Sequence, residues 1–408
     1  MSVTAADAAS CALHDAGTCR SCPHLSLPMP DQLAAKQSRV AALLAEHIPA
    51  ELWQAPAASA PTGFRNKAKM AVAGTAAHPT LGILDGAGCG VDLRTCPLHV
   101  PAIEAALPVL ADLVTELGLR PYDVPSRRGE LKYILVTASP DDDLMVRFVL
   151  RSRRYLERLR AAVPDLHRRL PQLAVAAVNI QSVHQAIIEG PEEIVLTEED
   201  RLLMRLSLPS PDGGGQAGRR AGSVELPLYL PTRSFFQTNT AVAEALYATA
   251  RNWAEQAEPA RVWDLFCGVG GFALALAAPG RRVLGVEVSA SAIDGARAAA
   301  DLMGLDPALV RFEAGDARVL DPAAEERAGG VQRPDLLVVN PPRRGIGEQL
   351  ATRIEASGVE RVLYSSCNPR TLAADLAHLP SMRVVRSRLF DMFPHTEHAE
   401  VLVELVRD

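Results

Sequence analysis

The stretch 262–271 constrains the fold more than any other part of the chain. Val262–Phe266 is apolar and β-prone, which predicts a short buried strand. In the loop that follows, the backbone can turn tightly and approach a ligand without an intervening Cβ, because three positions are glycine: Gly268, Gly270 and Gly271. Glu287 ends a second predicted strand, 282–287, 19 residues after Gly268. An acidic residue at about this spacing holds ribose hydroxyls in βαβ units, so we expect a nucleotide-type cofactor.

The rest of the C-terminal part alternates predicted strands and helices. Such a series folds into a parallel sheet covered on both faces. The last two predicted strands, 382–391 and 398–406, are joined by Phe393–Glu397 without a helix, so we expect an antiparallel pair. This α/β layout resembles the class I S-adenosylmethionine-dependent methyltransferase fold, a doubly wound, mostly parallel sheet that ends in an antiparallel hairpin. The other predicted strands are 261–266, 282–287, 309–313, 335–339 and 360–364, and the helices are 271–279, 289–303, 346–356 and 370–377.

Length and composition place the chain among packed globular proteins. Its 408 residues suffice for two or three domains, and 48% apolar against 22% charged residues excludes a disordered chain. The formal net charge of −6 gives no bulk attraction to nucleic acid, so RNA binding must rest on local basic patches. No apolar run of about 18 residues predicts a membrane span. The first residues lack a secretory signal, and we expect a cytoplasmic protein.

Cysteines concentrate near the N-terminus. Cys19 and Cys22 form a C-x-x-C pair that can chelate one metal centre, and Cys11 lies eight residues earlier. Cys96 is the best candidate for a fourth ligand. Four thiolates suit zinc or an iron–sulfur cluster, and the spacing alone does not choose between them. Free buried cysteines are the alternative, whereas Cys89, in a glycine-rich turn, is interpreted as incidental.

The middle of the chain is mixed and locally basic. Segment 63–70 interleaves basic residues with Phe64, which fits phosphate binding with base stacking or an ordinary strand with solvated lysines. The arginines of 147–169 indicate a phosphate-binding surface or a solvated helix face. Residues 211–215 predict a surface loop. The pattern of 71–230 predicts an α+β domain with strands 133–138, 144–150, 175–181 and 225–230 and helices 102–117 and 154–169, after an earlier amphipathic helix over 31–48.

Three polar motifs follow strands of the C-terminal part. Asn340–Gly345 contains two prolines, which hold Asn340 rigidly, and places Arg343 where amino-group methyltransferases have an aromatic residue. Cys367 ends a buried strand among polar neighbours, which favours a nucleophile over a structural cysteine. Glu400 begins the last strand and is either part of a solvated turn or a general base.

Cys367 and Glu400 have a common chemical rationale. Carbon 5 of uracil is a poor nucleophile, but addition of a thiolate to carbon 6 makes it enolate-like. Carbon 5 can then accept a methyl group, after which a base must remove its proton so that the thiol leaves. The reaction therefore needs one cysteine and one base acting on the same ring.

The motifs together resemble the RNA uracil-C5 methyltransferase family over nearly the whole chain. The short bacterial subgroup that methylates a uracil in 23S ribosomal RNA is the most similar. The resemblance implies Cys367 as nucleophile, Glu400 as base, and a [4Fe–4S] cluster with a structural or RNA-binding role. The motifs are Phe235–Asn239, Asp264–Gly270, Asn340–Arg343, Ser365–Asn368 and His395–Glu400. The implied cluster ligands are Cys11, Cys19, Cys22 and Cys96, and the implied S-adenosylmethionine contacts are Gln237, Phe266, Glu287, Asn340 and Asp316.

From the resemblance we expect three units: a cluster segment over 1–100, a central RNA-binding region over 101–230 and a catalytic domain over 231–408. The expected partner is 23S ribosomal RNA, bound by a monomer. Two features depart from many relatives. Too few residues precede Cys11 for a β-barrel RNA-binding domain, and Asn340 stands where many relatives have Asp.

Other functions stay open at this point. Uracil-C5 methylation of transfer RNA or of another ribosomal site is the nearest alternative, and the N-terminal cysteines argue against transfer RNA. An amino-group methyltransferase would need no cysteine. A non-catalytic iron–sulfur RNA-binding protein would leave Cys367 and Glu400 without a role.

Overall fold

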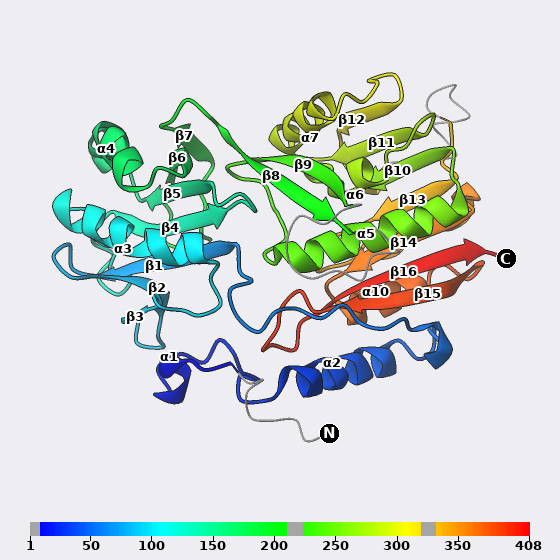
Figure 1. Cartoon of the computed structure of the whole chain (residues 1–408), viewed down its shortest axis with the longest axis horizontal. Helices are drawn as coiled ribbons and strands as arrows, with labels where there is room; N and C mark the ends of the chain where they lie inside the picture. Colours follow the sequence, from blue (N-terminus) through cyan, green and yellow to red (C-terminus); the bar gives the residue numbers. More distant parts are fainter. Residues whose placement is uncertain (1–8, 186, 210–222, 320–331) are drawn as a thin grey trace.

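The computed structural model describes residues 9–185, 187–209, 223–319 and 332–408. Within these ranges the chain forms two seven-stranded sheets and a two-stranded ribbon, β8–β9. The sheet built from the first half lies on one side of the molecule and the C-terminal sheet on the other, with α1 and α2 beneath them (Figure 1). The predicted loop 211–215 lies outside the described residues.

The C-terminal sheet has the strand order β12-β11-β10-β13-β14-β16-β15. Its first five strands are parallel, whereas β16 is inserted antiparallel between β14 and β15. The predicted α/β layout with an antiparallel C-terminal hairpin is therefore confirmed. The strands are β10 (Arg261–Leu265), β11 (Arg282–Glu287), β12 (Val310–Ala314), β13 (Leu336–Val339), β14 (Arg361–Ser366), β15 (Met382–Phe390) and β16 (Glu400–Arg407).

Both faces of this sheet are buried, which explains its nearly continuous apolar strands. Successive residues of a strand point to opposite faces, so Val262 packs in one core with the ribbon and Trp263 in another with α2. The covering helices are α5 (Thr240–Ala257), α6 (Gly271–Ala275), α7 (Ala290–Leu302), α9 (Gly347–Ser357) and α10 (Pro369–Leu376), with a 3₁₀ turn at Ala317–Val319.

The strand order reverses beside β10, because β11 and β13 lie on its two sides. Ligands of such sheets bind beyond the carboxyl ends of the strands at this switch point. We call this region, with the start of β16, the C-terminal edge. The C-terminal edge faces the other sheet (Figure 1).

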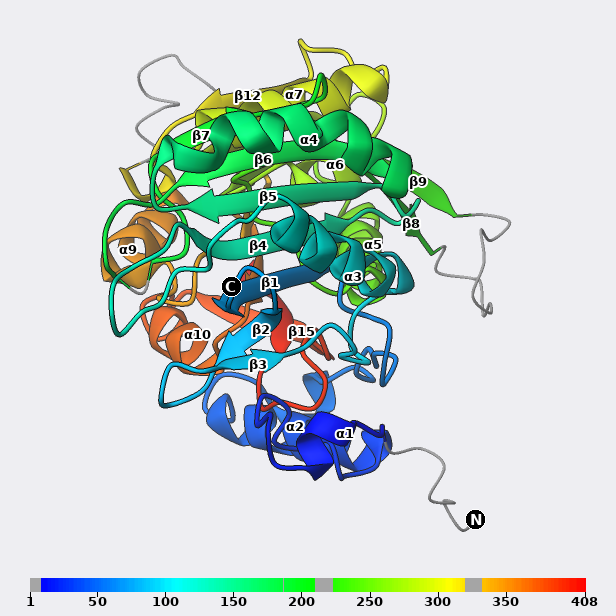
Figure 2. The same ribbon diagram turned by 90° about the vertical axis from the view of Figure 1, so that its left-hand side faces the viewer.

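The first-half sheet has the order β3-β2-β1-β4-β5-β6-β7 and takes strands from both sides of residue 100. Helices α3 and α4 cover one face (Figure 2), and β8 packs against the other. The strands β2, β3, β7 and β8 were not predicted, whereas β1 agrees in part with the ordinary strand that was one interpretation of 63–70. The elements are β1 (Lys67–Gly74), β2 (Pro79–Leu84), β3 (Gly90–Asp92), α3 (Pro101–Glu116), β4 (Leu131–Ala138), β5 (Leu144–Leu150), α4 (Leu156–Arg169), β6 (Leu173–Ile180), β7 (Glu192–Val195), β8 (Arg201–Leu208) and β9 (Val224–Pro231).

The N-terminal segment contains α1 (Ala12–Asp15) and α2 (Met29–Leu43), which matches the predicted amphipathic helix in part. Helix α2 contacts α10 of the C-terminal sheet, and Val40 packs in its core. Two short 3₁₀ turns, Ala50–Leu52 and Arg153–Tyr155, complete the described elements. None of the described helices has the length and apolar character of a membrane span.

Candidate active site

The glycine loop after β10 positions Glu287 through backbone donors. The Gly268 amide donates to Glu287 Oε2 over 3.3 Å and the Ser289 amide to Oε1 over 3.0 Å. Phe266 adopts a φ of +69°, which a bulky residue rarely adopts, so the loop is held in a strained turn. Gly270, with φ +86°, leaves no room for a side chain, since a Cβ would lie 3.1 Å from the Phe312 ring.

The other predicted cofactor contacts lie at nearby element ends. Gln237 precedes α5, is buried, and its carbonyl accepts a hydrogen bond of 3.0 Å from Asn66 Nδ2. Asn340 follows β13 directly. Asp316 follows β12, and its hydrogen bonds with Arg318 lower the carboxyl pKa to about 2. Asp316 is therefore a fixed, paired carboxylate.

The cysteine inside the loop, Cys267, is buried and faces negative charge. Burial and the carboxylates of Asp264 and Glu287 raise the pKa of the Cys267 thiol well above its usual value. The fully buried Asp264 accepts a hydrogen bond from the Ala273 amide at 2.9 Å, and burial raises its pKa to about 8. Cys267 thus stays a protonated thiol, which suits packing and not nucleophilic attack.

Cys367 follows β14 and lies against Arg343 of the Asn-Pro-Pro-Arg loop. Asn368 Nδ2 and Thr371 Oγ1 both donate to the Arg343 carbonyl, at 3.0 and 3.2 Å, which docks the loop beside the thiol. Burial and Glu400 raise the pKa of the half-buried Cys367 thiol, whereas the charge of Arg343 and a hydrogen bond from it lower it. Arg343 therefore stabilises the thiolate form.

Glu400 lies next to Cys367 across the antiparallel pair β14–β16. Ser365 pairs with Leu402 and Ser366 with Val401, and one further step of this register sets Cys367 opposite Glu400. The Ser365 hydroxyl donates to Glu400 Oε1 over 2.5 Å. Burial raises the pKa of Glu400 to about 7, because the charged form loses its hydration.

Helix α2 holds the loop that leads into Glu400, and we call these contacts the α2 brace. Lys36 Nζ lies 2.5 Å from Asp391 Oδ1 in a buried ion pair and also donates to the Phe393 carbonyl. Gln32 Oε1 accepts from the His395 amide over 2.9 Å. His395, with φ +62°, has its carbonyl bound by the His24 amide over 3.1 Å. The segment that carries the N-terminal cysteines thereby contacts the loop before Glu400.

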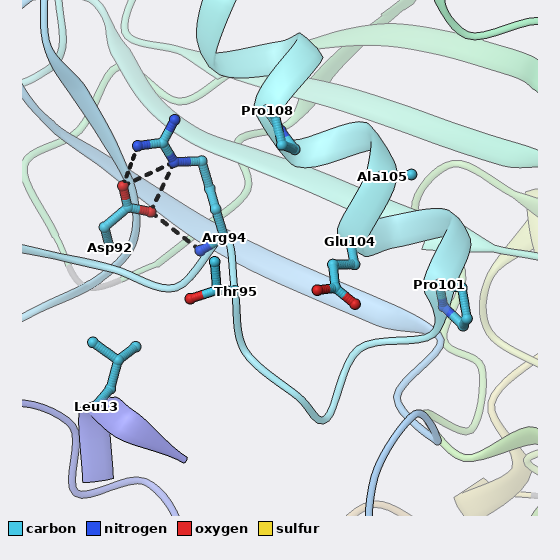
Figure 3. Close-up of a pocket in the computed structure, with 8 residues that line it drawn as sticks. All are labelled: Leu13, Asp92, Arg94, Thr95, Pro101, Glu104, Ala105 and Pro108. Atoms are coloured by element: carbon cyan, nitrogen blue, oxygen red, sulfur yellow. Dashed lines mark hydrogen bonds and ion pairs between the residues drawn. The ribbon is translucent and has the colours of Figure 1, made fainter. Parts of the chain in front are cut away.

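The four predicted metal ligands line one cavity of about 230 Å³, which we call the cysteine cavity. Burial and the other three thiols raise the pKa of Cys22 to about 11. Asp92 and Arg94 form a two-pronged ion pair that fixes the turn before Cys96; a separate, larger cavity of about 810 Å³ lies beside it (Figure 3). Among the described residues, no group of three or more His, Cys, Asp or Glu side chains has the geometry to hold a single metal ion.

The arginines of 147–169 are mostly neutralised by local acids. Arg147 is buried between Glu189 and Glu193, and Arg169 binds Glu116. On α4, further ion pairs join Arg160 to Glu157 and Arg168 to Asp165. This pairing favours the solvated-face interpretation of that helix over a phosphate-binding surface.

Sequence reasoning missed several residues of the site. Arg343 was noted only because it stands where amino-group methyltransferases have an aromatic residue. A positive charge in a strand-end loop could have indicated a partner for the strand-end cysteine. Ser365 was noted only as polar. Gln32 and Lys36 lie more than 350 positions from their partners along the chain, so no local pattern could have indicated the α2 brace.

The fold and the strand-end site define a class I methyltransferase. A family model described as tRNA (Uracil-5-)-methyltransferase matches residues 227–408. The crystal structure of the Pyrococcus abyssi tRNA (uracil-54, C5)-methyltransferase with S-adenosyl-L-homocysteine has a TM-score of 0.73 and 23% identity, covering 94% of this chain and 85% of that one. At this identity the likeness concerns the fold alone.

Relatives that match over nearly their full length show to which methyltransferase family the chain belongs. The 23S rRNA (uracil(747)-C(5))-methyltransferase RlmC of Halothiobacillus neapolitanus is 48% identical over 97% of this chain and 99% of its own length. RlmC of Escherichia coli K12 is 46% identical with the same coverage. The chain therefore belongs to the RNA uracil-C5 methyltransferase family.

Proposed function

We propose that this chain transfers a methyl group from S-adenosylmethionine to carbon 5 of a uridine in 23S ribosomal RNA. The juxtaposition of Cys367, Arg343 and Glu400 at the C-terminal edge carries the proposal, because it supplies the nucleophile and the base that the reaction needs. Relatives named for ribosomal RNA are 46–48% identical over nearly the whole chain, which favours this substrate over transfer RNA.

The reaction begins when the Cys367 thiolate adds to carbon 6 of uracil, and the electron pair of the 5,6 double bond moves toward carbon 5 and the adjacent carbonyl. Arg343 favours the thiolate beforehand. Carbon 5 then forms a bond to the methyl carbon as the bond from that carbon to sulfur breaks, and S-adenosylhomocysteine leaves. The Glu400 carboxylate removes the proton from carbon 5, and the released electron pair restores the double bond and expels the Cys367 thiolate. A pKa of about 7 lets Glu400 serve as a base near neutral pH.

The glycine loop is the proposed cofactor site. S-adenosylmethionine, when bound, supplies an electrophilic methyl group. Glu287, already oriented by two backbone amides, would accept the ribose hydroxyls. The loop's free glycine at 268, where an added Cβ would meet nothing within 4 Å, leaves space for close approach of the ligand. The remaining proposed contacts are Gln237, Phe266, Asn340 and Asp316.

A [4Fe–4S] cluster is the proposed occupant of the cysteine cavity. The donor set fits, because Cys11, Cys19, Cys22 and Cys96 line one enclosed space and electrostatically perturb one another. The positive charge of the cluster irons would favour the thiolate forms that mutual repulsion now disfavours. Its role is structural, in a segment that also contacts the loop before Glu400.

RNA recognition is assigned to the first-half sheet, whose face opposite α3 and α4 is turned toward the C-terminal edge and is covered in part by β8. We expect a monomer that acts on ribosomal RNA in the cytoplasm. The deciding experiment maps 5-methyluridine in 23S ribosomal RNA from cells with and without the protein. One methylated position that disappears on deletion and returns on complementation supports the proposal. An unchanged 23S map with a lost methyluridine in transfer RNA would contradict it.

A further inference from the structure

A second cavity, of about 340 Å³, lies at one end of the first-half sheet. It is formed where β1 and β2 end, where β4 begins, and by the loop that follows β6. We call it the Tyr122 pocket, because Tyr122 is among its lining side chains, with Lys132, Tyr133, His184 and Gln185. The reaction proposed above uses none of these residues.

Lys132 gives the pocket a buried cation without a carboxylate partner. The residue is only 7% exposed, its Nζ donates to the Val183 carbonyl over 2.7 Å, and it lies 4.9 Å from the centroid of the Tyr122 ring. No ion pair joins Lys132 to an Asp or Glu anywhere in the described part of the chain, and the nearby Arg151 adds positive charge. Because a buried ammonium without an anion is costly, the pocket favours an anionic group.

Aromatic side chains stand beside this cation. The Tyr122 hydroxyl and His184 Nδ1 are 2.9 Å apart, and the two ring centroids are separated by 6.2 Å. His184 is exposed, and Val183 next to it leaves 49% of its surface in solvent. A cation together with exposed ring and apolar surface is the combination that binds an unpaired nucleotide, with its phosphate on the cation and its base on the ring.

One lining residue of the Tyr122 pocket, Tyr133, lies on the face of the sheet that is turned toward the C-terminal edge. Tyr133 lies on the same face of β4 as Thr137, which pairs with Met145. Met145 packs in the core shared with β8 and the C-terminal sheet. Tyr133 therefore belongs to the face turned toward the C-terminal edge, opposite α3 and α4.

We propose that the Tyr122 pocket holds one unpaired nucleotide of the substrate RNA, distinct from the uridine that reacts at Cys367. Lys132 binds the phosphate, and His184 with Tyr122 supports the base. The inference rests on the proposed function and extends it, because it assigns a second anchoring point for the RNA. Such an anchor would fix the RNA strand relative to the C-terminal edge.

The test measures affinity of the full-length protein for a short, fluorescein-labelled, single-stranded RNA of mixed sequence. Lys132→Met and His184→Ala are each expected to weaken binding by about tenfold. Lys132→Met should also reduce the salt dependence of binding by about one phosphate contact. Arg168→Met, which removes the same charge from an exposed site on α4, is the matched control and should bind as the wild type does. Binding of S-adenosylhomocysteine should stay unchanged in all three variants.

The outcomes separate this inference from the proposed function. If the wild-type protein methylates the 23S transcript and the pocket variants bind RNA as tightly as the wild type, the RNA-binding role of the Tyr122 pocket is contradicted. The proposed function is not affected by that result. Binding of uridine monophosphate is measured in the same proteins. If the two pocket variants lose this binding but keep the RNA affinity of the wild type, the pocket binds a free nucleotide, and the inference is overturned. Wild-type protein that neither binds nor methylates the transcript would defeat both. His184→Ala truncates an exposed side chain, so it decides the question even where Lys132→Met fails to fold.

Discussion

The C-terminal edge and the cysteine cavity hold thiols in opposite electrostatic settings. At the C-terminal edge one thiol, Cys367, lies beside the guanidinium of Arg343, which offsets part of the rise in its pKa that burial and Glu400 cause. In the cysteine cavity four thiols face one another, and Cys22 has a pKa of about 11. A single thiol beside a cation can ionise and react, whereas four clustered thiols ionise together only when a metal compensates their charge. In the proposed function the same residue type therefore serves chemistry in one region and ligation in the other.

The largest effect on activity is expected at Cys367. Cys367→Ala should abolish methyl transfer to 23S transcript, because no other thiol at the C-terminal edge can add to carbon 6, while S-adenosylhomocysteine binding by calorimetry stays at the wild-type level. Cys267→Ala is the matched control and should retain most of its activity, since that thiol is buried and protonated. Activity lost in Cys267→Ala and kept in Cys367→Ala would reverse the assignment.

Glu400 gives the next largest effect. Glu400→Gln keeps the shape and a partner for Ser365 but cannot accept the carbon-5 proton, so the methylation rate should fall by about 10²–10⁴-fold. The covalent protein–RNA adduct should then persist on a denaturing gel, because elimination of Cys367 is blocked. An equally slow variant that forms no adduct would indicate that Glu400 acts before methyl transfer.

The pH dependence tests the same carboxyl group. Glu400 has a pKa raised to about 7, so it is protonated and inactive as a base below that pH. Ionisation of Glu400 alone should make the single-turnover rate rise by up to about tenfold per pH unit below pH 7, and ionisation of Cys367, whose pKa is raised, should keep the rate rising above pH 7. The sign for stability is opposite, since a carboxyl with a raised pKa loses favourable free energy as pH rises through 7. A rate that falls between pH 6 and 7 would exclude Glu400 as the base.

Substitution of a cysteine in the cysteine cavity should change the metal content of the protein more than its methylation activity. Cys22→Ala should lose the bound iron and the visible absorbance of anaerobically purified protein, while the exposed Cys89→Ala keeps both. Methylation should fall only several-fold, because the cavity contacts the loop before Glu400 through His24 and supplies no reacting group. A colourless wild-type protein with stoichiometric zinc would contradict the cluster.

The smallest effect on the rate is expected at the α2 brace, where the effect on stability is larger. Lys36→Met leaves Asp391 buried without its partner, which should cost about 3–5 kcal/mol of unfolding free energy in urea titrations. Asp391→Asn in the Lys36→Met background should recover part of the loss, because the unpaired charge is then removed. Arg160→Met breaks an exposed pair and should change little. Equal losses of unfolding free energy in Lys36→Met and Arg160→Met would show that the buried ion pair does not stabilise the protein.

Local patterns were sufficient for the C-terminal sheet. Its apolar strands, the glycine loop and the strand-end motifs occur in continuous runs, so the predicted elements agree with the observed ones to within a few residues. Prediction was weaker in the first half, where β2, β3, β7 and β8 were missed. Strand β8 alternates buried and half-buried residues along its whole length, a period-2 pattern that was available but not used. Pairing in that sheet is mostly antiparallel, and β1 pairs both with its sequence neighbour β2 and with the distant β4.

For this protein the sequence by itself determined the fold class, the family and the identity of the candidate nucleophile, base and cysteine ligands, because each sits in a short motif with its own physical signature. Only the tertiary structure decided how these groups are tuned. Arg343 reaches Cys367 because β13 and β14 are parallel neighbours, and Ser365 reaches Glu400 because β14 and β16 are paired in one register. The α2 brace and the unpaired Lys132 are likewise invisible in a linear chain, since burial and long-range contact exist only once the chain has folded.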